Sequence, residues 1–343
     1  MSERLTHRTA VQHPRWVPWI PFLLLPPFAL SLGMLAPEIT PAPGKTGSVY
    51  QNLQSLLPPG IRLYTHLVLA LALLHGGGKL VRTLLPPKSP LSSLILAQSL
   101  ASVTLLILLT PWFRDLLMPS PMLPAITALV WAQITLIQSG QPRKHTLAAV
   151  SGLLAGLAAG LSLFIGLGIL PLCLWLATDL IRKSDQAIRR PVYFVSGMVT
   201  GLLPFMRELP ARLQNPPFSP ADWLQSFTLI YPLLGIGGVL LLLLGLTVGT
   251  LQKNRNLLTF VFTTAILLKA GHIALSDASA VHTGALLFYP ALLCAYGVFR
   301  LLKGIESGTH ALHSAKAKYV VQTCLILLII LAKLWTARIY HSQ

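Results

Sequence analysis

Apolar stretches of about twenty residues recur along the whole chain and are separated by short segments that hold most of the charges. A helix needs about 20 predominantly apolar residues to cross the hydrocarbon core of a membrane. Only 10% of the 343 residues are Asp, Glu, Lys or Arg, whereas roughly a quarter are charged in an average soluble domain. The pattern argues against a soluble protein and predicts an all-α, polytopic integral membrane protein.

Eleven stretches meet this requirement, and we expect about eleven transmembrane helices in a single domain from residue 16 to residue 337. Residues 1–15 are expected to form a basic cytoplasmic N-terminus, and residues 338–343 a short outer tail. The expected helices cover residues 16–36, 61–77, 91–111, 121–138, 146–162, 163–181, 191–206, 227–250, 256–275, 284–302 and 319–336.

The fifth and sixth stretches form one apolar run that is too long for a single ordinary span. Basic residues lie at both ends of the run, with Lys144 before it and Arg182 after it. Because cytoplasmic loops retain positive charge, both ends are expected on the same side of the membrane. The run therefore predicts a tight helical hairpin, in which small residues allow close packing. Its glycines include Gly156, Gly160, Gly166 and Gly168.

The distribution of charge sets the expected orientation. The net charge is +17, and 18 of the 26 Lys and Arg residues fall on the same side as the N-terminus when the stretches are threaded alternately through a membrane. This bias predicts a cytoplasmic N-terminus and an outer C-terminus, as in a bacterial inner membrane protein. The first stretch is expected to be an uncleaved anchor. Nucleic-acid binding is not expected, because the basic residues are scattered over many short loops.

Several simple kinds of site are not indicated. The cysteines Cys173, Cys294 and Cys324 lie inside apolar runs without metal-ligand spacing, so neither a disulfide framework nor a zinc site is expected. The run of Gly76, Gly77 and Gly78 does not follow a strand, and we interpret it as a flexible helix end and not as a nucleotide-binding loop.

Two outer loops, residues 37–60 and 207–226, are longer than a turn between helices requires, and loops of this kind often hold function. In the first loop, Val49, Leu53, Leu56 and Leu57 have a helical spacing. That spacing predicts a short helix over residues 46–57 that lies on the membrane surface. The second loop contains four prolines, which exclude a continuous helix.

Both loops resemble a large bacterial membrane family that is related to protein O-mannosyltransferases and has the GT-C glycosyltransferase fold. The first matching segment is LAPEITPAPGKTGSVYQNLQSLLPPGIRLY, residues 35–64. It opens on a turn similar to the family's Leu-Ala-Pro and closes on one similar to its His-Pro-Pro-Gly-Tyr-Pro. The matching residues are Leu35, Ala36 and Pro37, then Pro58, Pro59, Gly60, Leu63 and Tyr64.

Two further segments follow in the family's order. GLLPFMRELPARLQNPPFSPADW resembles a Gly-Leu-Leu-Pro segment with an arginine, an Asn-Pro-Pro and an acidic turn. SDASAVHTGALLFYPALLCAYGV resembles a segment with an acid, an aromatic-Pro pair and a glycine. The residues that carry these matches are Gly201, Leu202, Leu203, Pro204, Arg212, Asn215, Pro216, Pro217 and Asp222 in one, and Asp277, Phe288, Tyr289, Pro290 and Gly297 in the other.

The resemblance implies transfer of a sugar from a polyprenyl phosphate at the outer face, but the family's first-loop acidic motif is replaced here by residues 41–47, PAPGKTG. Such a transfer needs a base near the acceptor oxygen and positive charge or a metal near the departing phosphate. The candidate catalytic acids are Glu38 and Asp222. The alternatives are a solvated interface residue for Glu38 and a turn or helix-cap residue for Asp222. No cofactor is identified, and a divalent metal is expected only if the protein is an active enzyme.

Six residues are candidates for binding a lipid phosphate or substrate: Arg212, Arg207, Lys269, His66, Tyr64 and Asn215. An intramembrane cation such as Lys269 usually pairs or lines a polar cavity, although it can also extend outward to the headgroups. For His66, a headgroup contact is the alternative.

Three classes of function follow from these observations. The first is a divergent glycosyltransferase that uses a lipid-linked sugar. The second is a catalytically inactive, GT-C-derived scaffold or accessory subunit whose partners are other membrane proteins. The third class is a transporter. It is the weakest of the three, because no internal repeat is visible and acids within the apolar stretches are scarce.

Overall fold

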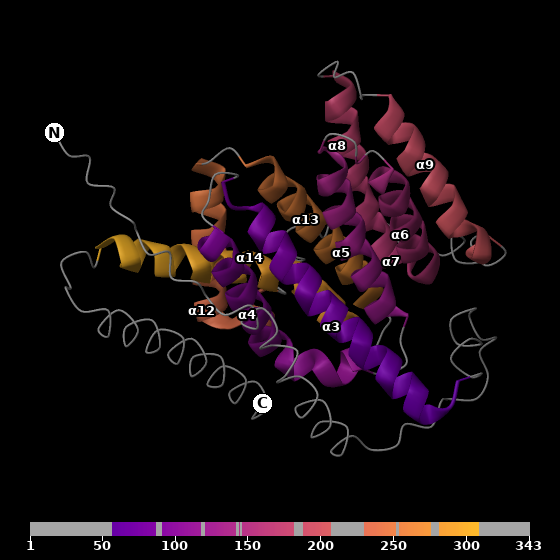
Figure 1. The fold of residues 1–343 in the computed structure, drawn as a ribbon. Helices are drawn as coiled ribbons and strands as arrows, with labels where there is room; N and C mark the ends of the chain where they lie inside the picture. Colours follow the sequence, from indigo (N-terminus) through magenta and orange to yellow (C-terminus); the bar gives the residue numbers. More distant parts are fainter. Residues whose placement is uncertain are drawn as a thin grey trace.

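The computed structural model describes residues 57–86, 91–117, 121–141, 144, 146–181, 188–206, 230–251, 254–275 and 281–308. Within these ranges the chain forms helices joined by turns, without a strand (Figure 1). The elements are α3 (Pro59–Thr83), α4 (Leu91–Leu117), α5 (Met122–Ser139), α6 (Leu147–Leu161), α7 (Leu163–Gly166), η2 (Leu167–Ile169), α8 (Leu170–Ile181), α9 (Arg189–Leu202), η3 (Leu203–Phe205), α12 (Ile230–Leu251), α13 (Arg255–Leu275) and α14 (Val281–Gly308).

The helical class expected from the sequence is confirmed for the described residues. Each of the nine apolar stretches between residues 61 and 302 coincides with a helix or with a helix extended by a short 3-10 turn. The first and last expected stretches, 16–36 and 319–336, lie outside the described residues. Among the described helices, the segments Met122–Ser139 and Leu163–Ile181 are long and apolar enough to cross a membrane, judged by length and composition.

The long helix α3 runs diagonally across the view in Figure 1 and packs on both α4 and α5. Helices α5 to α9 gather on one side of it, and α4, α12 and α14 on the other. The largest fully buried side chains are aromatic, and they come from α9, α13 and α14: Phe194, Phe260, Phe288, Tyr289 and Tyr296. Among them, Tyr289 of α14 forms a hydrogen bond with Gln133 of α5 and so connects the two groups.

The three consecutive glycines lie within α3 and do not end it, so the interpretation of a flexible helix end is wrong. A methyl group at Gly76 would overlap Val130 of α5, and one at Gly78 would overlap the Ser102 hydroxyl and the Gln98 carbonyl of α4. At Gly77 it would overlap Leu105 of α4. The missing side chains let two helices approach α3 closely, and this packing supports a helix that glycine by itself would weaken.

The expected hairpin between residues 146 and 181 is present. The chain leaves the helical conformation at Ser162 (φ −150°, ψ 114°), whose hydroxyl accepts a hydrogen bond from the Ile165 amide at 3.4 Å. Gly166 then packs against Ala159, on the other side of the turn. The hydroxyl of Ser162 thus caps the returning helix and fixes the position of the reversal.

The glycines of α6 have a different partner from the one that the sequence suggested. Gly152 and Gly156 face the backbone of α9, where added methyl groups would overlap the carbonyl oxygens of Phe194 and Met198. In return, Gly197 of α9 faces the carbonyl of Ala149. Two small-xxx-small faces therefore pack against each other, which is a common way for membrane helices to approach closely.

Candidate functional site

The structure describes only part of the site that the sequence predicts at the outer end. Tyr64, His66 and Lys269 lie within the described residues, whereas the two candidate acids and three of the candidate phosphate ligands lie outside them. Those outside are Glu38, Asp222, Arg207, Arg212 and Asn215, together with residues 46–56 of the surface helix expected over residues 46–57.

Tyr64 and His66 occupy different faces of the first turns of α3. Tyr64 is 69% exposed, and His66 is buried with 2% exposure. The Nδ1 atom of His66 lies 2.8 Å from the carbonyl oxygen of Arg62. Because a carbonyl can only accept, Nδ1 carries the proton in this contact. Two residues that are two positions apart point about 200° apart around a helix, so this pair cannot line one side of α3.

Lys269 is the predicted residue with the most unusual surroundings. It lies on α13, between the buried residues Leu267 and Leu268 and the C-terminal end of the helix. Its ammonium nitrogen is buried and has no hydrogen-bond partner within the described part of the chain. A buried charge without a partner is costly, and in membrane helices it usually indicates a functional site.

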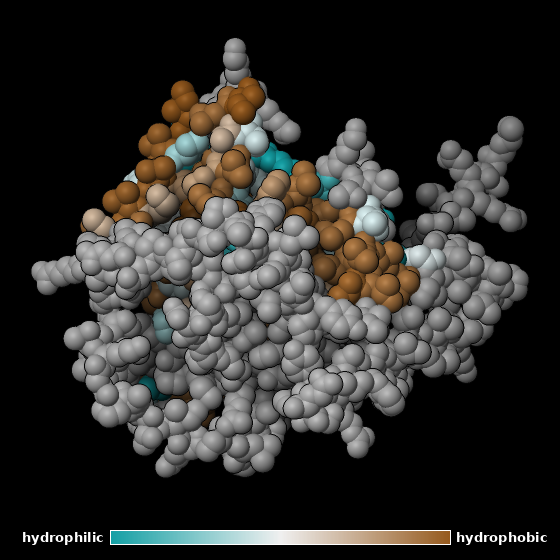
Figure 2. Space-filling view, turned by 180° about the vertical axis from the view of Figure 1, so that it is seen from behind, coloured by the Kyte–Doolittle hydropathy of each residue, from teal (hydrophilic) through white to brown (hydrophobic). Residues whose placement is uncertain are grey.

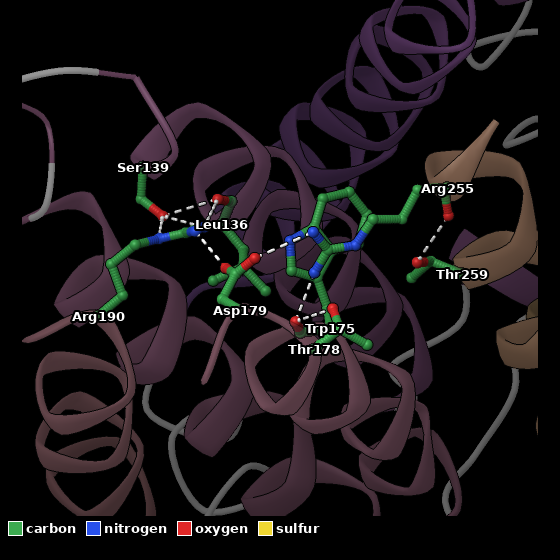
Figure 3. Close-up of polar contacts among 8 residues, drawn as sticks. All are labelled: Leu136, Ser139, Trp175, Thr178, Asp179, Arg190, Arg255 and Thr259. Carbon is green, nitrogen blue, oxygen red and sulfur yellow. Dashed lines mark hydrogen bonds and ion pairs between the residues drawn. The ribbon is translucent and has the colours of Figure 1, made fainter. Parts of the chain in front are cut away.

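The opposite end of the helix bundle holds a second polar cluster, formed by Asp179, Arg190, Arg255, Ser139 and Trp175 (Figure 3). We call it the inner cluster, because the sequence assigns these residues to the cytoplasmic side. Asp179 of α8 accepts hydrogen bonds from two guanidinium groups: one from Arg190 of α9, the other from Arg255 of α13 at 3.0 Å. One carboxylate thereby joins three helices.

Arg190 connects α9 to α5 as well. Its Nε donates to the Ser139 hydroxyl at 3.1 Å, and its Nη2 donates to the Leu136 carbonyl at 3.0 Å. Burial lowers the pKa of Arg190 while the Asp179 carboxylate opposes this shift, and a guanidinium stays charged at neutral pH. Arg190 thus satisfies carbonyl and hydroxyl groups at the C-terminal end of α5, where a positive charge is favourable.

Arg255 connects α13 to α8 in a similar way. It donates a hydrogen bond to the Trp175 carbonyl, and its guanidinium carbon lies 4.2 Å from the centre of the Trp175 ring. Such a cation–π contact contributes about 0.5–2 kcal/mol. Next to it, Asn254 and Asn256 donate to the carbonyls of Leu84 and Thr83, both at 2.8 Å. The ends of α3, α5, α8, α9 and α13 consequently meet at one end of the bundle.

A third polar group lies between α5, α13 and α14. The Tyr289 hydroxyl donates to Oε1 of Gln133 at 2.9 Å, and Nε2 of Gln133 donates to the Thr263 hydroxyl at 3.2 Å. All three side chains are buried. The chain of hydrogen bonds satisfies the buried amide and hydroxyl groups, so it fixes the register of three apolar helices.

Sequence reasoning missed both of these polar groups as connections. In the sequence, the charges of Asp179, Arg190 and Arg255 contribute only to the predicted orientation of the chain. No role is predicted for Gln133 or Thr263. The signal available was the presence of polar residues inside or beside apolar stretches, since such residues usually face a protein partner. Which partner each would find depends on helix packing, and the sequence does not specify it.

Comparisons with known proteins give no relative: no family model, curated protein or solved structure matches the chain. Within the described residues, no group of three or more His, Cys, Asp or Glu side chains lies close enough to hold a metal ion. The chemistry of the site therefore has to be argued from its own residues.

Proposed function

We propose that this chain is a polytopic, GT-C-like integral membrane protein that binds a polyprenyl-phosphate sugar at its outer end and transfers the sugar to an acceptor. The proposal includes the eleven spans, the cytoplasmic N-terminus and the outer C-terminus expected from the sequence. The observation that carries it is the buried ammonium of Lys269, which has no hydrogen-bond partner among the described residues.

The position of Lys269 supports a role at the outer end. It follows Arg255 of the inner cluster by fourteen positions on one continuous helix, which corresponds to about 21 Å at 1.5 Å per residue. With Arg255 at the inner boundary of a hydrocarbon core of about 30 Å, Lys269 would lie in the outer half, which supports the proposed outer site. The phosphate of a polyprenyl phosphate would supply the negatively charged partner that Lys269 lacks among the described residues.

The surface of the described helices supports a membrane environment. Large apolar side chains are exposed along α8 and α9, among them Leu174, Ile181, Val192, Val195 and Val199. Figure 2 shows an extensive hydrophobic surface on the upper part of the molecule, where these helices lie. Contiguous exposed apolar surface of this kind is unfavourable in water and is matched by lipid chains.

Binding of polyprenyl phosphate to the purified protein in detergent tests the proposal. We expect the wild type to bind polyprenyl phosphate at least tenfold more tightly than the uncharged polyprenol, and Lys269→Met to lose this difference. Lys144→Met is the matched control, because Lys144 is exposed, lies in the connection between α5 and α6, and donates a hydrogen bond to the Gln141 side chain. Equal binding by the wild type and Lys269→Met would refute the role of Lys269.

An accessory subunit without catalytic activity is the second candidate, and the observation that favours it is the absence of the acidic motif from residues 41–47. Such a protein would bind the lipid without releasing polyprenyl phosphate from a lipid-linked sugar. It would also be recovered from its membrane together with other membrane subunits. Release of polyprenyl phosphate by the isolated chain in the presence of an acceptor would exclude this alternative.

A further inference from the structure

The outward face of α9 combines one exposed cation with a continuous apolar surface. Arg189 is the first residue of the helix and is exposed. Val192, Val195 and Val199 follow at spacings of three and four residues, with exposed fractions of 60%, 51% and 52%. Residues with this spacing lie on one side of a helix, so Arg189 stands at the end of an apolar stripe.

Among the residues that the structure describes, the charged groups of the inner cluster next to Arg189 are more positive than negative. Arg190 and Arg255 share the single carboxylate of Asp179, and Arg189 takes no part in these ion pairs. Arg255 remains 29% exposed. Within the described residues, the inner cluster has two cations, Arg190 and Arg255, for the one anion, Asp179. The cluster therefore keeps a net positive charge, to which Arg189 adds another.

Exposed apolar residues flank the cluster on α8 as well. Leu174 and Ile181 are 55% and 79% exposed and lie seven positions apart, which places them on one side of α8. Asp179 lies between them in sequence but points into the bundle. Ile188, directly before Arg189, is 72% exposed. Exposed apolar side chains, Ile181 and Ile188, therefore lie next in sequence to the charged ends of α8 and α9.

From this juxtaposition we infer that the inner end of α8 and α9 binds an anionic phospholipid, with its phosphate at Arg189 beside the inner cluster and its acyl chains along the apolar stripe. The inference rests on the proposed membrane location, but it concerns a different end of the molecule from Lys269. Anionic and zwitterionic phospholipids offer the same acyl chains, but only the anionic lipid has a net negative charge. The positive charge at this end of the helices therefore favours an anionic headgroup. A basic surface next to cytoplasmic helix ends is suited to such lipids.

Native mass spectrometry of the full chain, released from micelles that contain phosphatidylglycerol and phosphatidylcholine in equal amounts, tests this inference. We expect phosphatidylglycerol to be retained in preference, and Arg189→Gln to lower its retention about fivefold, the effect of one cation near an anionic lipid surface. Lys144→Gln is the control, because it removes one exposed cation from another connection at the same end of the bundle. It should leave retention unchanged.

Two further measurements distinguish a lipid headgroup from free phosphate as the anion that binds at Arg189. Val192→Asn removes apolar contact but no charge, so it should weaken lipid retention, whereas it would not affect a site for free phosphate. Inorganic phosphate at millimolar concentration should not displace the lipid. The inference is wrong if both phospholipids are retained equally, if Arg189→Gln behaves like Lys144→Gln, or if inorganic phosphate competes. Lys269 is tested separately with polyprenyl phosphate. The phospholipid site at Arg189 can therefore be refuted while the proposed function stands, and the reverse is also possible.

Discussion

Asp179 and Arg190 form an ion pair between the end of α8 and the start of α9, with side chains that are only 12% and 9% exposed. The two residues are eleven positions apart in the chain, and Arg255 joins the same carboxylate from α13. Loss of one member of a buried pair leaves an uncompensated charge, which costs more than the pair itself contributes.

Asp179→Ala should therefore destabilise the protein by about 3–5 kcal/mol, because two guanidinium groups lose their shared carboxylate. Thermal unfolding in detergent, followed by circular dichroism, measures the change. Lys144→Ala at an exposed position should stay within about 0.5 kcal/mol of the wild type. Similar unfolding midpoints for the two variants would contradict a structural role of the inner cluster.

Gly197→Ala should destabilise the packing of α6 against α9 by at least about 1–3 kcal/mol, because the methyl group would overlap the carbonyl of Ala149. The matched control is Gly304→Ala in α14, where an added methyl group meets nothing within 4 Å. This control should stabilise its helix by up to about 1 kcal/mol, the difference in helix propensity. Opposite shifts of the unfolding midpoint are the expected result, and shifts of the same sign would count against the close approach of the two helices.

Tyr289→Phe should cost about 1–3 kcal/mol, because Oε1 of Gln133 loses its donor in a buried position. The double variant Gln133→Leu/Tyr289→Phe removes both partners and should regain most of that loss, since no unpaired amide remains. Unfolding midpoints of the two single variants and the double variant form a complete cycle. Strictly additive losses would show that the two side chains do not act together.

Lys269→Met should raise the unfolding midpoint in the absence of any lipid phosphate, since it removes a buried charge that has no hydrogen-bond partner within the described ranges. The same substitution should remove binding of polyprenyl phosphate, and stability gained at the expense of function is typical of binding sites. Addition of polyprenyl phosphate should raise the midpoint of the wild type only. If Lys269→Met lowers the midpoint instead, the ammonium has a structural partner.

The candidate acids are tested by release of polyprenyl phosphate from a lipid-linked sugar in the presence of an acceptor. Glu38→Gln or Asp222→Asn should abolish the release if that carboxylate acts as the base, because an amide cannot accept the acceptor's proton. Binding of the lipid serves as the control and should remain in both variants. Unchanged release by both variants would refute the assignment of these residues.

The sequence by itself determined the helical class and the approximate ends of the nine apolar stretches that are helical in the described residues, because the length and apolar character of a stretch are local properties. It also identified the reversal near Ser162 and placed the basic helix ends that form the inner cluster at one end. Only the tertiary structure decided which helices become neighbours. Gly152 and Gly156 pack on α9, Asp179 collects two arginines, and the amide of Gln133 meets Thr263 and Tyr289. Such pairings depend on the rotation and order of the helices in the bundle, which an apolar pattern does not encode.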